Sequence, residues 1–228
     1  MANLPEETLL LLTDDESGKP LVEESKVITA LGAAAVIELV LQGSLRMTAK
    51  GDARYKAGRL VKTEVLPDDP LLRDLVEVVH DRKPVHALHR IGGASDWKGR
   101  AKALRESLFD RLVEQRVLTE REGKVLGLFT TRKHLPGTND LESPVVSRIE
   151  DSLFHGADPD DRTAVLVSIL NAVGALPRLF PDAKKKDMKA RAKEISENAP
   201  LNGSFKDALA AVDAALFAAV TAGAVSSS

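Results

Sequence analysis

The apolar residues of the chain recur mostly with a helical period. Between Ser25 and Gln42, the positions of Val27, Leu31 and Leu39 fall on one face of a helix. Gly43 follows, and glycine suits the left-handed backbone position that commonly ends a helix. The same period predicts further helices over residues 4–12, 71–80, 84–91, 97–116, 142–154, 160–175, 183–197 and 204–222.

Two segments show the alternation of β-strands instead. Residues 44–66 alternate apolar and polar positions around a turn at 50–52, which predicts a small β-ribbon or wing. A second strand is predicted over 124–131, after a turn at Glu122-Gly123, and residues 135–139 (LPGTN) are predicted to form a loop. The predicted fold class is mainly α. We expect a single helical domain over residues 1–224 with two short β-hairpins or wings, and a frayed tail over 225–228.

One pattern occurs twice at a predicted helix-to-strand junction. Residues 39–45 (LVLQGSL) and 112–118 (LVEQRVL) share the pattern LVxQxxL. Duplication and convergence on similar helix-end chemistry both remain open as explanations.

Composition limits the classes of function. With 43% hydrophobic residues among 228, a wholly disordered chain is excluded. The net charge of −2 gives no global attraction to nucleic acid or anionic lipid, so such a partner must meet a local patch. Cysteine is absent, which excludes disulfides and thiolate chemistry and fits a reducing cytoplasm.

No apolar run approaches the roughly 20 residues that span a bilayer, and the N-terminus lacks signal-peptide features. We therefore expect a soluble chain whose membrane contact is peripheral.

Signals of catalysis and metal binding are weak. His86 and His89 are three residues apart on one predicted helix, but the sequence shows no second pair of ligands at matching spacing that would complete a metal site. No glycine-rich phosphate loop follows a strand, and no nucleophile-elbow sequence occurs. We expect a protein that is not an enzyme and has no catalytic residues, metal or cofactor.

Cationic residues are concentrated in a few segments. On the helix predicted over 97–116, Lys98, Lys102 and Arg105 fall on one face. Further cations expected near them on a membrane-facing surface are Arg90, Arg100, Arg132 and Lys133. A later run contains Arg178, Lys184, Lys185, Lys186, Lys189, Arg191 and Lys193. For this later run, a solvated helix face and contact with an anionic surface both remain open.

The ribbon offers an alternative, because a helix followed by a wing is the outline of a winged-helix DNA-binding domain. Its cations are Arg54, Lys56, Arg59 and Lys62. The low aromatic content of 4% disfavours stacking on single strands, and the pI near 6.2 is low for a DNA-binding domain. Nucleic acid is thus the less favoured partner, and a solvated hairpin face explains the ribbon equally well.

Several segments together resemble the Golgi phosphoprotein 3 family. They are ITALGAAAVIELVLQGSLRM, KALRESLFDRLVEQRVLT and FTTRKHLP in that order, with EETLLLLTDDESGK before them and TAVLVSILNAVGALPRLF after them. The resemblance covers nearly the whole chain. It implies a mostly helical domain with short β-hairpins.

Eukaryotic members bind phosphatidylinositol 4-phosphate on the cytoplasmic face of the Golgi and hold glycosyltransferases there. Bacteria also have members, and this chain resembles those more because it starts directly at the domain.

The resemblance places a headgroup pocket at two cations one turn apart, Lys102 and Arg105. The other two pocket positions of the family, a tryptophan and an arginine, fall at Glu23 and Gly32 here, and Trp97 is the only tryptophan. We therefore expect an anionic phospholipid headgroup similar to phosphatidylinositol 4-phosphate, bound by a cytoplasmic, peripheral, non-enzymatic adaptor. An adaptor that has lost its lipid site is an alternative.

The family's hairpin mediates self-association, which places a homo-oligomer contact at residues 128–139. Several pockets presented together raise the effective concentration at a membrane. The sequence does not specify client proteins.

Overall fold

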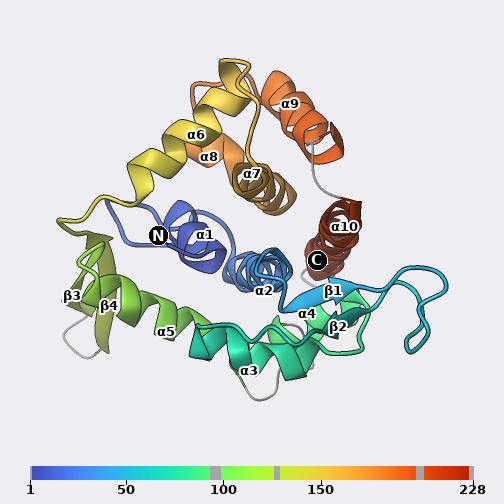
Figure 1. Ribbon diagram of the computed structural model, residues 1–228. Helices are drawn as coiled ribbons and strands as arrows, with labels where there is room; N and C mark the ends of the chain where they lie inside the picture. Colours follow the sequence, from blue (N-terminus) through green and yellow to red (C-terminus); the bar gives the residue numbers. More distant parts are fainter. Residues whose placement is uncertain (1, 93–98, 126–128, 199–202, 226–228) are drawn as a thin grey trace.

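The computed structural model describes residues 2–92, 99–125, 129–198 and 203–225 (Figure 1). Its helices are α1 (Leu4–Leu11), α2 (Glu24–Leu41), α3 (Pro70–Val79), α4 (Pro84–Gly92), α5 (Arg100–Glu114), α6 (Glu142–Phe154), α7 (Asp161–Val173), α8 (Leu176–Leu179), α9 (Lys185–Asn198) and α10 (Gly203–Val225). The strands are β1 (Leu45–Met47), β2 (Leu60–Lys62), β3 (Leu118–Val125) and β4 (Phe129–Pro136). The predicted mainly α fold with two short strand pairs is confirmed.

Both strand pairs are antiparallel, β1 with β2 and β3 with β4. In the second pair, Leu118 lies opposite Pro136 and Gly123 lies opposite Thr131. The turn predicted at Glu122-Gly123 is therefore wrong, because these residues lie within β3. Leu135 and Pro136, predicted as loop, belong to β4. At the C-terminus α10 reaches Val225, the first residue of the predicted frayed tail, and residues 226–228 lie outside the described residues.

Helix α2 forms the centre of the core (Figure 1), where α1, α4, α7 and α10 pack around it. From Ala30 to Leu39 every residue of α2 is buried. A helix that is apolar on all sides is stable only when surrounded by other elements. Small residues let the neighbours approach, since a Cβ at Gly32 would lie 3.3 Å from Cγ2 of Ile91. The residues of α2 classed as exposed, Glu24 and Ser25, lie in its first turn.

Buried ion pairs hold α1 in place. Arg162 of α7 donates from Nε to Glu7 Oε2 at 2.7 Å and from Nη1 to Glu38 Oε2 at 3.3 Å. Arg111 of α5 makes two hydrogen bonds to the carboxylate of Asp69, at 2.7 and 3.0 Å. Burial raises the pKa of Glu7, and the adjacent Arg162 opposes that effect. Nη1 of Arg111 also lies 3.3 Å from Oε1 of Glu6 in α1. Partly buried charges require partners, so these pairs link α1 to α5 and α7.

The repeated LVxQxxL pattern corresponds to one local geometry. Gln42 and Gln115 cap α2 and α5 with nearly the same backbone angles, φ −75° in both cases. The next residues, Gly43 and Arg116, are left-handed with φ of 76° and 59°. Each is followed by one residue and then a strand. The shared sequence pattern thus marks a shared way of leaving a helix for a β-strand.

The β3–β4 hairpin docks against the turn that follows α1. Gly18 of this turn has a φ of +65°, and a Cβ there would lie 2.7 Å from the backbone oxygen of His134. Its N–H donates to the Asp14 carbonyl at 2.7 Å, which closes the turn. Glycine is required here for two reasons. It adopts the left-handed conformation without strain, and it has no Cβ to collide with the His134 backbone. The approach brings His134 of β4 next to α5.

Candidate functional site

Lys102 and Arg105, the two cations predicted for the site, lie one turn apart on α5 but differ in their surroundings. The Lys102 side chain is 76% exposed, whereas that of Arg105 is 24% exposed. The Arg105 Cζ lies 5.1 Å from the ring centroid of Phe109, within range of a cation–π contact. The Arg105 Nε is buried and has no hydrogen-bond partner in the described part of the chain. Arg105 is therefore partly buried and packed on an aromatic ring, whereas the Lys102 side chain is mostly exposed to solvent.

Each of the two cations has a carboxylate partner. Arg105 Nη1 pairs with Oε1 of Glu24, in the first turn of α2. Lys102 Nζ lies 3.8 Å from Oε1 of Glu106. Glu24 and Glu106 are 52% and 65% exposed, and ion pairs at such exposure contribute only about 0–1 kcal/mol. These partners can be exchanged for another anion at little cost.

A cleft of about 540 Å³ adjoins Arg105. It is lined by Gly18, Arg105, Glu106, Phe109, Asp110, Arg132 and His134. The structure thus brings Arg132, predicted only as a surface cation, to the same cleft as Arg105. Lys102 lies outside the lining. The sequence reasoning missed His134, although strand alternation in FTTRKHLP places it on the same face as Arg132, two residues away.

His134 is held by an aromatic stack. Its ring lies parallel to that of Phe109, with centroids 3.9 Å apart and an interplanar angle of 9°. Its Nε2 lies 3.7 Å from Oε2 of Glu120 on β3. Burial lowers the pKa of His134, Glu120 opposes this, and the nearby Arg105 and Arg132 lower it further. The imidazole is therefore mainly neutral at neutral pH, in the middle of a group of fixed charges.

Among the other predicted surface cations, Arg90, Arg100 and Lys133 do not line the Arg105 cleft. Arg100, at the start of α5, donates from Nη1 to the Arg90 carbonyl at 3.3 Å, so these two lie together where α4 ends. Lys133 alternates with Arg132 and His134 on β4 and is exposed. Lys98 and Trp97 lie outside the described residues, as does Leu128, the first residue of the predicted self-association segment 128–139.

The ribbon cations of the winged-helix alternative are partly engaged by α3 and the turn after it. Arg59 Nη1 donates to the Asp81 carbonyl at 2.6 Å and to Asp81 Oδ1 at 3.1 Å. Lys62 Nζ lies 2.6 Å from Oε1 of Glu77. Arg54 and Lys56 are exposed in the loop between β1 and β2. Two of the four ribbon cations are thus held by carboxylates, as Arg105 and Lys102 are.

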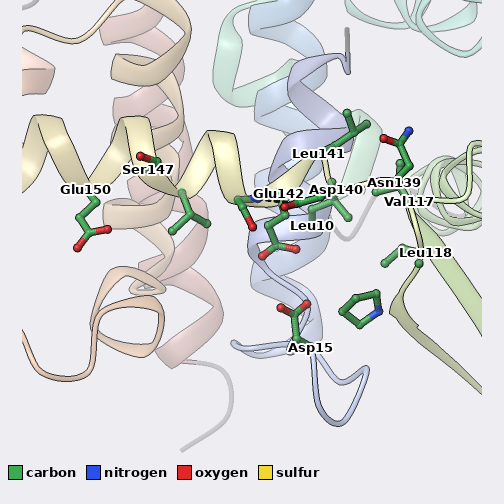
Figure 2. Close-up of a pocket in the computed structure, with 14 residues that line it drawn as sticks. Leu10, Asp15, Val117, Leu118, Asn139, Asp140, Leu141, Glu142, Ser147 and Glu150 are labelled. Carbon is green, nitrogen blue, oxygen red and sulfur yellow. Dashed lines mark hydrogen bonds between the residues drawn. The ribbon is translucent and has the colours of Figure 1, made fainter.

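A second cleft, of about 520 Å³, lies where α6 begins and is acidic (Figure 2). Figure 2 shows Asp15, from the turn after α1, and Glu142 of α6 with their carboxylates directed at the same space. Burial, together with the charges of Asp15 and Asp140, raises the pKa of Glu142 to about 7. The carboxylates that line this cleft disfavour an anion there.

Comparison with protein families agrees with the resemblance seen in the sequence. The family model described as Golgi phosphoprotein 3 (GPP34) matches residues 4–212. The chain belongs to the Golgi phosphoprotein 3 family. The match includes α1, the α2–β1 junction, α5 and both strands of the second hairpin, and so contains every residue of the Arg105 cleft.

The Golgi phosphoprotein 3 family is not a known enzyme family. Among curated proteins, none matches the chain. Within the described residues of this Golgi phosphoprotein 3 family member, no helix combines the length and apolar character that crossing a bilayer needs.

Proposed function

We propose that this member of the Golgi phosphoprotein 3 family is a peripheral, non-enzymatic membrane adaptor. It binds an anionic phospholipid headgroup, similar to phosphatidylinositol 4-phosphate, in the cleft beside Arg105. The observation that carries the proposal is the state of Arg105, which packs on Phe109 at the edge of a cleft and has an unbonded Nε. A guanidinium presents several donors in a planar fork that matches a phosphate group.

Glu24 occupies the place on Arg105 that a phosphoryl group would take. A phosphate monoester carries about −1.5 to −2 charges near neutral pH, against −1 for a carboxylate, so it competes well for the guanidinium. Exchange is favoured further because the Arg105–Glu24 pair is partly exposed. Lys102, on the preceding turn, has a flexible and exposed side chain that adds a second cation once the headgroup has arrived.

One pocket of this kind gives modest affinity, and stable peripheral attachment generally takes two signals. We infer that self-association through residues 128–139 supplies the second signal, by presenting several pockets to one membrane. This compensates for the family tryptophan, whose position falls at Glu23 in this chain. The proposed location is therefore the cytoplasmic face of a membrane, with client proteins held by the adaptor.

Liposome flotation tests the proposal. Wild-type protein is mixed with phosphatidylcholine vesicles that contain or lack phosphatidylinositol 4-phosphate. We expect capture only by the former, loss of capture with Arg105→Ala, and reduced capture with Lys102→Ala. Arg54→Ala is the matched control, because it removes an exposed cation far from the cleft and is expected to float like wild type. Equal flotation of Arg105→Ala and wild type would refute this site, and absence of wild-type capture by either vesicle would favour an adaptor without a lipid site.

A further inference from the structure

We propose that His134 is a third anion-binding group of the Arg105 cleft, and that the cleft takes up a proton on His134 when it binds a phosphoryl group. This deepens the proposed function and rests on it, because it concerns the same cleft. The ligand chemistry is that of a phosphoryl anion, whether carried by a lipid headgroup or free in solution.

The geometry places His134 where an anion would meet it. His134 and Arg132 alternate on one face of β4, and both line the cleft with Arg105. The ring of Phe109 contacts two of these groups, since it stacks on His134 at 3.9 Å and lies 5.1 Å from the Arg105 guanidinium. One aromatic side chain of α5 therefore positions both an imidazole and a guanidinium beside the same space.

The charges around the cleft explain why a proton is needed. The charged groups that line it or face the His134 ring are Arg105, Glu106 and Asp110 of α5, Glu120 of β3 and Arg132 of β4. The turn after α1 contributes Gly18, whose close approach to His134 is to backbone atoms. Glu24 of α2 adds a further carboxylate on Arg105. The two arginines are thus outnumbered by carboxylates, and with a neutral His134 the cleft attracts a dianion weakly.

Protonation of His134 changes this balance. An imidazolium adds a positive charge to the cleft that Arg105 and Arg132 line, and a bound anion in turn stabilises the imidazolium. Such coupling is reciprocal, so a ligand that favours the protonated form binds more tightly as the pH falls. In the empty cleft, burial and the two arginines keep the imidazole neutral. For an anion whose charge stays at −2, the affinity is therefore expected to rise by up to about tenfold for each unit by which the pH falls. This holds between the pKa of His134 in the occupied cleft and its pKa in the empty cleft.

Inorganic sulfate is the suitable probe, because unlike phosphate it does not change charge where histidine titrates, between about pH 5 and 8. Isothermal titration calorimetry in two buffers of different ionisation enthalpy measures both the affinity for sulfate and the protons taken up. For the wild type we expect proton uptake of up to about one per site and tighter binding at lower pH. His134→Phe keeps an aromatic ring against Phe109, and is expected to bind sulfate more weakly, with no proton uptake. His134→Gln serves as a second variant.

The outcomes separate this inference from the proposed function. If wild-type protein and His134→Phe show the same pH dependence, or if sulfate binds without proton uptake, the inference is overturned and the headgroup site stands. If Arg105→Ala binds sulfate as wild type does, both fall. If no sulfate binds at any pH, the inference is overturned, and vesicle flotation alone decides on the headgroup site.

A second measurement follows the wild-type protein and uses a variant only to assign the His134 signals. The ring resonances of His134 in the wild-type protein, identified by their absence from the His134→Phe spectrum, should titrate at higher pH when sulfate is present. An unchanged titration overturns the inference. Inorganic phosphate competing with vesicles that contain phosphatidylinositol 4-phosphate distinguishes the sources, because displacement of the vesicles only at high phosphate concentration identifies the lipid as the preferred carrier of the phosphoryl group.

Discussion

Arg105 of α5 is ion-paired with Glu24 in the first turn of α2, across a sequence separation of 81 residues. From the resemblance, the tryptophan position of the family is expected at the neighbouring residue, Glu23. This chain therefore places negative charge beside the guanidinium that is proposed to bind phosphate. The carboxylate keeps Arg105 oriented while the cleft is empty, and it lowers the attraction that the cleft exerts on an anion.

Glu24→Gln is expected to increase vesicle capture, because the variant frees Arg105 from a competing charge. A pair at this exposure contributes about 0–1 kcal/mol, so the affinity for vesicles containing phosphatidylinositol 4-phosphate should rise by up to about fivefold. Glu23→Gln is the matched control, since Glu23 is 71% exposed and pairs with Lys26 instead. Flotation at several lipid concentrations measures the difference. Weaker capture of Glu24→Gln would mean that Glu24 supports the binding conformation and does not compete with the ligand.

The cations proposed for the site were predicted from the sequence, but their carboxylate and aromatic partners could not be. Helical spacing places Lys102 and Arg105 one turn apart, and the family resemblance marks them as a pocket. Pairing with Glu24 depends on how α2 and α5 pack, which no local pattern records. His134 could have been placed on one face with Arg132 by strand alternation. Its contact with Phe109 depends on the docking of the hairpin and so could not have been predicted.

The elements of the fold were predicted where one local preference dominates. The period of apolar residues located most helices, because burial of one face requires it. The turn at Glu122-Gly123 was wrong because glycine is an ambiguous signal within a strand. Pairing with β4 extends β3 to Val125 and overrides that local preference. The buried pairs of Glu7 and Arg162 likewise join helices far apart in the chain and leave no local pattern.

Gly18→Ala is expected to destabilise the protein and to disturb the cleft. The substitution adds strain at a φ of +65° and places a Cβ 2.7 Å from the His134 carbonyl oxygen. Gly58→Ala is the matched control, because its φ is +74° but nothing lies within 4 Å of the added Cβ. We expect a loss in the free energy of unfolding of about 1 kcal/mol for Gly58→Ala and about 2–3 kcal/mol for Gly18→Ala. Urea denaturation measures both, and equal losses would show that the turn does not need this close approach.

Arg116→Gly is expected to stabilise the protein. Arg116 is exposed and left-handed, with a φ of 59°, at the position that Gly43 occupies after α2. The left-handed backbone costs a non-glycine residue about 1–2 kcal/mol. Glycine avoids this strain, and the additional backbone entropy that it loses on folding costs only roughly 0.5–1 kcal/mol. The reciprocal change, Gly43→Ala, should lower the free energy of unfolding by about the same amount. Thermal and urea denaturation test the pair, and a loss of stability in Arg116→Gly would mean that its side chain makes a contact that outweighs the strain.

Glu142 is expected to make the stability of the fold depend on pH. Burial and the charges of Asp15 and Asp140 raise its pKa from 4.5 to about 7 in the folded protein. Between these two values the folded state retains a proton that the unfolded state has lost, so stability falls as pH rises from about 4.5 to 7 and levels off above that. Glu142→Gln should remove most of this fall and be more stable than wild type at pH 8, a value about one unit above the raised pKa. Glu150→Gln, on the exposed side of the same cleft, is the control. The urea midpoint measured across this range decides, and parallel profiles for wild type and Glu142→Gln would show that the carboxyl pair at Asp15 and Glu142 does not govern stability.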